Sequence, residues 1–229
     1  MLDVYITNCS EPGTLALTFD DGPYNYTDHV LDVLKQQQVK ATFFIVGNNL
    51  GKGQIDDEST GWPKVLRRMH ADGHQLASHS WTHQNLSAAT EEVRSQQIIY
   101  NEMAFRNIFG WFPKYIRPPY GTCSRVSGCL DYVTKLGYHV INYNIDTQDY
   151  QHDSASEIQL SKNIFSNNVS LDAKVHNYIA MSHDTHQQTA YNFTTFMLKT
   201  LKERGYRAVT VGDCLGDPPN NWYVNASRA

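Results

Sequence analysis

Two short polar segments of the chain carry side chains that could share one metal ion. Leu-Ala-Leu-Thr-Phe-Asp-Asp-Gly-Pro contains the adjacent acids Asp20 and Asp21, and the later segment Ser-His-Ser-Trp-Thr-His contains His79 and His83. One carboxylate and two imidazoles are a common protein contribution to a catalytic zinc site, which leaves room for water and substrate. The remaining acid would be free to act as a base. This pattern predicts a catalytic metal site with a base beside it.

Taken alone, each segment has a simpler interpretation, as a solvated turn or as two ordinary histidines. Their positions favour the interpretation that the two segments form one metal site. Leu15–Phe19 has the composition of a buried strand, and the turn residues Asp20–Pro23 end it. Gln75–Ala77 also ends in polar residues. Strand ends of this kind can meet at one rim of an α/β barrel or sheet, where such folds place their active sites.

The composition predicts a single domain that spans residues 1–229. With 41% hydrophobic and 12% aromatic residues, the chain can form a full core. The net charge of −4, without a basic run or a phosphate-binding glycine motif, argues against a nucleic-acid partner. No apolar stretch reaches the roughly 18 residues of a membrane span. We expect a monomer that does not insert into membranes.

Two signals predict an oxidising, extracellular compartment. The four cysteines lack the paired spacing of a zinc site, so two disulfides are expected, and the preferred of three pairings joins Cys9 to Cys214 and Cys123 to Cys129. Six glycosylation sequons begin at Asn8, Asn25, Asn85, Asn168, Asn192 and Asn225. Together the cysteines and the sequons favour secretion from a eukaryotic cell. The alternative is a cytosolic enzyme with reduced thiols, in which the sequons are chance tripeptides. The start, Met-Leu-Asp-Val, does not resemble a signal peptide, which predicts a mature or trimmed form.

Apolar β-type runs alternate with helical patterns, which is typical of a parallel α/β architecture. We predict an irregular barrel of about seven strands, with a rim loop at Gly47–Trp62. The predicted strands are Leu15–Phe19, Ala41–Val46, Gln75–Ala77, Tyr115–Arg117, Val140–Ile145, Tyr178–Met181 and Arg207–Val211. The predicted helices are His29–Gln38, Lys64–Asp72, Thr90–Phe109, Leu130–Leu136, Ala155–Phe165 and Phe193–Arg204. Several helices are followed by glycine, which suits a helix end.

Polar clusters follow three further predicted strands: Arg-Pro-Pro-Tyr-Gly, Asp-Thr-Gln-Asp-Tyr and Met-Ser-His-Asp. Together with the two segments described first, these motifs, in this order, resemble those of the polysaccharide deacetylases, the family-four carbohydrate esterases with the NodB homology domain. The resemblance covers Thr18 to His186. It implies a distorted (β/α) barrel, a divalent metal that is commonly zinc although cobalt or other ions can serve, and removal of acetyl groups from polysaccharides.

The resemblance also implies a role for each motif residue. Asp20 matches the general base, and the metal ligands match Asp21, His79 and His83. The backbone N–H of Tyr120 matches a donor to the oxyanion that forms when water attacks the acetyl carbonyl. The metal would polarise this carbonyl and acidify the attacking water, and the unligated base would take the proton.

The remaining motif residues support the base and supply an acid. His183 matches the general acid that protonates the departing amine. Arg117 resembles the residue that orients Asp20, and this contact would keep the carboxylate ionised. Asp149 resembles the carboxylate that supports His183 and raises its pKa, although Asp146 is nearer the strand and could serve instead. A buried ion pair without a catalytic part is the alternative for Arg117 and Asp149.

Substrate contacts are expected from Tyr120, Tyr150, Met181 and Trp81. Met181 stands where the family often has leucine, and Tyr150 where it often has tryptophan. Both residues are suited to an apolar acetyl pocket or a sugar face.

The preferred function is deacetylation of β-1,4-linked N-acetylglucosamine in chitin or chitooligosaccharides by a secreted or cell-wall enzyme of fungal type. Peptidoglycan deacetylation and acetylxylan ester hydrolysis are the alternatives within the family. A glycan-binding protein without turnover would have lost Asp20 or a ligand, and neither is lost. A non-haem iron oxygenase shares the ligand triad but not the βα pattern.

Overall fold

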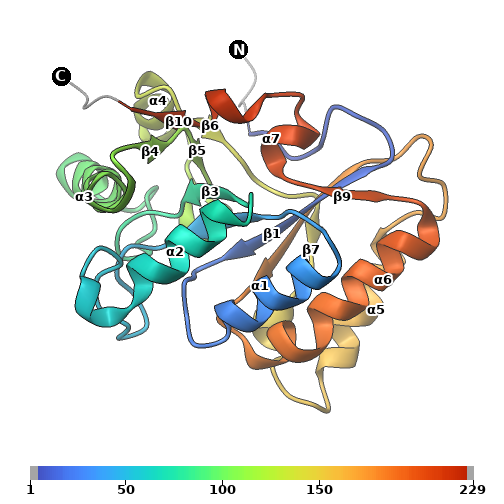
Figure 1. Cartoon of the computed structure of the whole chain (residues 1–229). Coiled ribbons are helices and arrows are strands. Elements are labelled where there is room, and N and C mark those ends of the chain that lie inside the picture. The colour runs from blue at the N-terminus through green and yellow to red at the C-terminus, as the bar shows by residue number, and fades with distance from the viewer. Residues whose placement is uncertain (1–4, 226–229) are drawn as a thin grey trace.

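The computed structural model describes residues 5–225 and shows a curled parallel sheet with helices packed around it (Figure 1). Its strands are β1 (Thr14–Asp20), β2 (Thr42–Ile45), β3 (Gln75–Ser78), β5 (Tyr115–Ile116), β6 (His139–Val140), β7 (Ile145–Asp146), β8 (Tyr178–His183) and β9 (Arg207–Val209). Seven of them follow the order β6-β5-β3-β2-β1-β8-β7, and β9 pairs with β1 outside this path. All of these pairings are parallel. The predicted distorted barrel of about seven strands is confirmed.

The central strand β1 is buried along its whole length, as its apolar and β-branched residues predict. One edge pairs with β8 from Leu15 to Asp20. The other edge pairs with β9 in its first half and with β2 in its second half. This register places Asp20 beside His183 on the neighbouring strand. Two residues from distant motifs therefore meet at the carboxyl end of the sheet.

The segment predicted as one strand, Val140–Ile145, forms two separate strands in the structure. β6 pairs with β5, whereas β7 pairs with β8 at the opposite end of the strand order. The residues between them, 141–144, connect the two edges of the sheet. This correction has a local cause, because the polar Asn142 and Asn144 interrupt the apolar pattern that a continuous buried strand requires.

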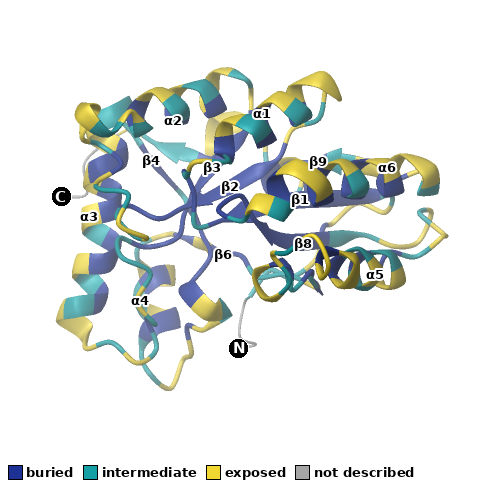
Figure 2. Cartoon of the chain, turned by 90° about the horizontal axis from the view of Figure 1, so that it is seen from below, coloured by how far each residue is buried: buried dark blue, intermediate teal, exposed yellow. Residues whose placement is uncertain are grey.

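Helices cover the outside of the sheet, with buried residues facing the strands and exposed residues facing outward (Figure 2). The longer helices are α1 (Thr27–Gln36), α2 (Trp62–Ala71), α3 (Glu91–Phe109), α4 (Cys129–Lys135), α5 (Ile158–Asn168) and α6 (Thr194–Arg204). Each overlaps a predicted helix. Gly110 and Gly205 end α3 and α6 in the left-handed conformation, which glycine adopts without steric cost. A short α7 (Val211–Cys214) and the antiparallel pair β4 (Phe112–Pro113) and β10 (Tyr223–Val224) were not predicted.

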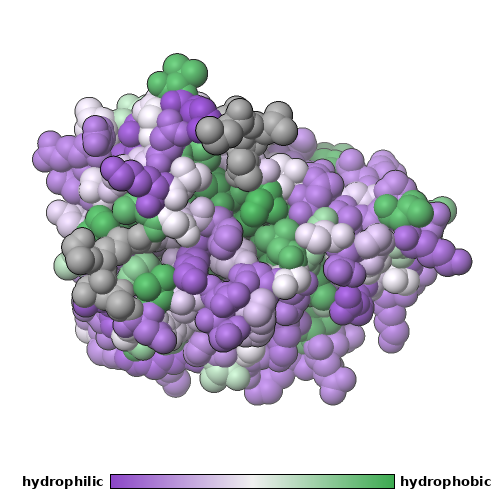
Figure 3. Space-filling model, turned by 90° about the horizontal axis from the view of Figure 1, so that it is seen from above, coloured by the Kyte–Doolittle hydropathy of each residue, from purple (hydrophilic) through white to green (hydrophobic). Residues whose placement is uncertain are grey.

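Both disulfides have the preferred pairing: Cys9 is bonded to Cys214, and Cys123 to Cys129. The N-terminal segment is thereby attached to α7, which lies with β10 in the upper part of Figure 1. Seen from above, this face is mostly hydrophilic, with hydrophobic side chains near its middle (Figure 3). Among residues 5–225, no helix combines the length and the apolar character needed to cross a bilayer. Residues 1–4, where the trimmed start was inferred, and the end of the last sequon lie outside the described range.

Candidate active site

The first element of the site is a buried ion pair between Asp20, at the end of β1, and Arg117, just after β5. Arg117 Nη1 lies 2.7 Å from Asp20 Oδ1 and donates a second hydrogen bond to Thr18. The guanidinium also lies over the ring of Phe44, 4.1 Å from its centroid. A single nitrogen of the guanidinium, Nη1, therefore holds Oδ1 of the Asp20 carboxylate.

Burial raises the pKa of Asp20, while the positive charge of Arg117 and the nearby His183 oppose that rise. The net direction of the pKa shift is upward, and the Arg117 contact acts against it, which is the direction that the sequence predicts for this contact. Desolvation outweighs the ion pair because both groups are almost completely buried. A carboxylate whose pKa lies above its ordinary value is a stronger base, which suits proton abstraction.

Asp21, His79 and His83 converge beside this ion pair and could hold a metal ion. Their candidate ligand atoms all lie within 4.8 Å of one another. Asp21 Oδ1 is 3.5 Å from His79 Nε2 and 3.3 Å from His83 Nε2. The same oxygen is buried without a hydrogen-bond partner. An oxygen and two imidazole nitrogens directed at one point are a donor set suited to zinc.

The hydrogen bonding of His79 fits this use. Its Nδ1–H donates to the backbone carbonyl of Arg117 at 2.6 Å, which leaves the lone pair of Nε2 directed toward Asp21. Burial lowers the pKa of His79 to about 3, against the opposing charge of Asp21. The imidazole is therefore neutral at physiological pH, as metal binding requires.

Several residues of the site adopt the left-handed backbone conformation, although they are not glycines. Asp21 has φ 75°, Ser80 φ 69°, His83 φ 59° and Tyr120 φ 58°. Such conformations are uncommon for residues with a β-carbon and are found preferentially at functional sites. Here they turn the chain sharply after strands β1, β3 and β5, which brings side chains from three loops together.

On the neighbouring strand β8, His183 forms a second buried pair with Asp149. His183 Nδ1–H donates to Asp149 Oδ1 at 2.8 Å, and Asp149 Oδ2 accepts hydrogen bonds from the His183 backbone N–H and the Thr189 hydroxyl. Burial alone would lower the pKa of His183, but Asp149 and the two acids at the end of β1 raise it to about 10. The imidazole is thus held as a cation, ready to donate a proton.

The structure distinguishes Asp149 from Asp146 as the partner of His183. Asp146 instead accepts hydrogen bonds from the backbone of Gln148 and, at 3.3 Å, from the hydroxyl of Tyr150. Its carboxylate therefore fixes the orientation of Tyr150, whose ring lies edge-on to His183 at 5.4 Å. The choice between the two acids needed the structure, because both follow the same predicted strand.

A cavity of about 340 Å³ connects these groups. Its walls are Asp20, Asp21, His79, His83, Arg117, Pro118, Tyr120, Gly121, Tyr143, Tyr150, Met181 and His183. All of the sequence-predicted site residues lie on it except Asp149, which stands behind His183, and Trp81. The Trp81 ring packs against Gly47 and lies edge-on to Tyr100. This packing directs the ring toward the loop after β2, and the expected contact of Trp81 with substrate stays a prediction.

Sequence analysis missed Tyr143, which contributes to the cavity wall between β6 and β7. The predicted strand Val140–Ile145 places this residue in the interior of a continuous strand. The interruption by Asn142 and Asn144 was the available signal, because a strand that breaks at the rim presents its side chains to the site.

Comparison with known proteins gives a consistent result. The family model for polysaccharide deacetylases matches residues 7–141. A chitin deacetylase from Colletotrichum lindemuthianum is 45% identical over 95% of this chain and 86% of its own length, and one from Pestalotiopsis sp is 41% identical over 95% of this chain and 69% of its own length. The solved structure of the Colletotrichum lindemuthianum enzyme has a TM-score of 0.93 at 43% identity and covers 100% of this chain and 98% of that one. The chain therefore belongs to the polysaccharide deacetylase family.

Proposed function

We propose that this protein removes acetyl groups from N-acetylglucosamine units of chitin or chitooligosaccharides with the help of a divalent metal, zinc in the first instance. The observation that carries the proposal is the single cavity at which a buried base, a metal-binding group and a charged acid meet. The names of the two fungal relatives support the substrate.

Asp21, His79 and His83 would hold the metal. Once bound, it would polarise the acetyl carbonyl and lower the pKa of the attacking water. The same oxygen and imidazole donors can accept cobalt or other divalent ions, so the donor set alone does not select zinc.

In the proposed reaction, Asp20 takes a proton from a water molecule while the oxygen of that water bonds to the acetyl carbon. Arg117 keeps the carboxylate in position, and the backbone N–H of Tyr120 is our candidate donor to the developing oxyanion. Protonated His183 then passes its proton to the sugar nitrogen as the carbon–nitrogen bond breaks, because an unprotonated amide nitrogen is a poor leaving group. The products are acetate and a glucosamine unit.

Substrate contacts in this proposal come from the exposed rings of Tyr120 and Tyr150, which can pack against sugar faces, and from the apolar Met181 beside the reacting acetyl group.

We further propose a single-domain, monomeric enzyme that acts outside the cell or in the cell wall of a eukaryote of fungal type. Two disulfides and the fungal relative of solved structure support this setting.

Acetate release from chitopentaose, peptidoglycan and acetylated xylan, measured side by side, tests the proposal. Each substrate is incubated with the protein as prepared, with a chelator, and with zinc added back. We expect release from chitopentaose that the chelator abolishes and zinc restores. Release from xylan alone would assign an esterase, and release from peptidoglycan alone would assign a cell-wall deacetylase of bacterial type. No release from any of them, with zinc bound, would reject enzymatic activity on these substrates.

A further inference from the structure

The rim loop, Gly47–Trp62, forms hydrogen bonds with both of the turns that carry the metal-binding side chains. We call residues 20–23 the acid turn and residues 79–83 the histidine turn. The two turns follow different strands, and their geometry relative to each other determines whether one ion can reach all three ligands. The rim loop follows β2, the strand that lies between β1 and β3 in the sheet.

Two side chains of the rim loop bind the backbone of the acid turn. Lys52 Nζ lies 3.2 Å from the carbonyl oxygen of Asp21, and Asn49 Nδ2 lies 3.4 Å from the same oxygen. A backbone bond from Val46 N–H to the carbonyl of Gly22, 3.2 Å long, continues this contact along the chain. The carbonyl group of a metal-binding residue is therefore held by two donors from a single loop.

The beginning of the same loop binds the histidine turn through its backbone. Gly47 N–H donates to the Ser80 carbonyl at 3.2 Å, and Asn48 N–H donates to the Trp81 carbonyl at 2.7 Å. The Trp81 ring covers Gly47 so closely that any side chain at residue 47 would overlap it. The Trp81 ring therefore packs the histidine turn against the beginning of the rim loop.

Asp21 needs such support because of its backbone conformation. Its φ of 75° is unfavourable for a residue with a β-carbon, and it determines the direction in which the carboxylate leaves the chain. Beneath the turn, Asp184 is fully buried, accepts a hydrogen bond from Thr27 and lies where a side chain at residue 22 would be. The acid turn is thus packed from below and held by hydrogen bonds from the rim loop.

We propose that Asn49 and Lys52 are positioning residues that set the metal affinity of the Asp21, His79 and His83 group. Both act through the Asp21 carbonyl, which they fix so that the carboxylate faces the two imidazoles. The inference rests on the proposed function for the assignment of this group as the metal site. Neither side chain is one of the cavity walls. Second-sphere contacts of this kind commonly change metal affinity by ten- to a hundredfold.

The test is a zinc titration of the metal-free full-length protein in competition with a chromophoric chelator. Lys52→Met and Asn49→Ala should each weaken zinc binding by roughly tenfold, and Lys52→Arg should restore most of the loss because it keeps a donor. The cobalt-substituted forms of the two weakened variants should show an altered visible spectrum, which reports ligand geometry independently of catalysis.

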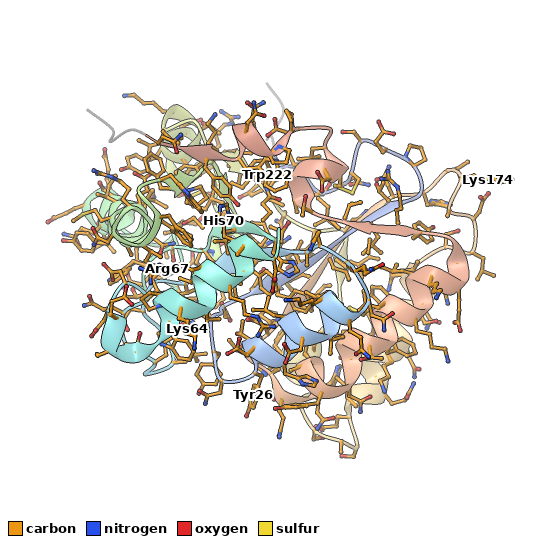
Figure 4. All side chains as sticks on the ribbon, in the orientation of Figure 1. Tyr26, Lys64, Arg67, His70, Lys174 and Trp222 are labelled. Carbon is orange, nitrogen blue, oxygen red and sulfur yellow. A yellow bond between two sulfur atoms is a disulfide. The ribbon has the colours of Figure 1, made fainter. Side chains whose placement is uncertain are left out.

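Two matched controls separate positioning from general destabilisation. Asn48→Ala removes a neighbouring amide that makes no side-chain hydrogen bond within residues 5–225, and Lys64→Met removes an exposed amine on the outer face of α2 (Figure 4). Both should leave zinc affinity and the cobalt spectrum unchanged.

Unchanged zinc affinity in folded Lys52→Met and Asn49→Ala would overturn the inference, as would equal losses in the two controls. The proposed function can fail separately. If the wild-type protein binds zinc as expected and the variants weaken it, but chitopentaose is not deacetylated, the positioning role stands and the proposed activity does not.

Discussion

At the scale of single residues, the two sides of the cavity have opposite electrostatic character. Asp20 is buried beside the guanidinium of Arg117 and has a pKa above its ordinary value, whereas His183 is buried beside the carboxylate of Asp149 and has a pKa of about 10. Near neutral pH the first group can gain a proton and the second can lose one. Pairs of groups whose environments separate their pKa values in this way are typical of acid–base catalysis.

Asp20→Asn should keep metal binding and lose deacetylation. The amide has nearly the shape of the carboxylate but cannot take a proton, so kcat/KM for chitopentaose should fall by about 10²- to 10⁴-fold. Metal content by elemental analysis should remain equal to that of the wild type. Near wild-type activity in a variant with normal zinc content would refute the role of Asp20 as base.

Asp149→Asn should shift the alkaline limb of the pH–rate profile to lower pH. Asparagine can still accept the hydrogen bond from His183 Nδ1–H, but it removes the negative charge that raises the pKa of the imidazole. A general acid is active below its pKa, so a lower pKa means that activity disappears earlier as pH rises. The measurement is kcat/KM from pH 5 to 10 for both proteins, and superimposable alkaline limbs would contradict the assigned role.

At the scale of elements, the site depends on strands that end together at one rim. The end of each strand and the polar residues after it could be predicted from the sequence, because apolar runs and turn residues are local signals. Asp20, His79 and His183 were therefore located correctly at strand ends.

Contacts that depend on distant pairing could not be predicted in the same way. Asn142 and Asn144 mark the break between β6 and β7 in the sequence, but the partners of the two strands, β5 for β6 and β8 for β7, are far apart in sequence. The hold of the rim loop on Asp21 likewise depends on side-chain directions within an irregular segment. Hydrophobic periodicity carries no information about either contact.

Asn101, in the middle of α3, links the strands that precede the rim loop and the histidine turn. Its buried amide nitrogen donates to the Ile45 carbonyl at 3.1 Å and to the Ser78 hydroxyl at 2.9 Å. Asn101→Ala should lower the free energy of unfolding by about 2–3 kcal/mol, since it leaves buried acceptors without a donor. Asn107→Ala, which removes an exposed bond from the same helix, should cost about 1 kcal/mol or less in urea unfolding. Equal costs would contradict the bridging role.

At the scale of the whole molecule, the disulfide between Cys9 and Cys214 joins residues 205 positions apart, whereas Cys123 and Cys129 are separated by 6. In the chain-entropy model, a crosslink stabilises the folded state by restricting the unfolded chain, and longer loops give larger effects. The first bond therefore restricts almost the entire chain.

Replacing Cys9 and Cys214 together with alanine should lower the free energy of unfolding by about 5 kcal/mol, compared with about 2 kcal/mol for the Cys123 and Cys129 double variant. Urea unfolding of the two variants and the wild type measures the difference. A larger loss from the short loop would show that native contacts, and not the length of the closed loop, determine the effect.

Arg117 connects the base and the metal-binding group through two different parts of one residue. Its side chain holds Asp20, and its backbone carbonyl orients His79. Substitution can remove the first contact but not the second, since every amino acid supplies the same carbonyl. A substitution of Arg117 would therefore deprive Asp20 of its ionic partner, while the backbone carbonyl of residue 117 would still orient His79. Under the proposed function, a lineage that lost catalysis in this way would have a short mutational route to a protein that still binds a metal ion and a sugar.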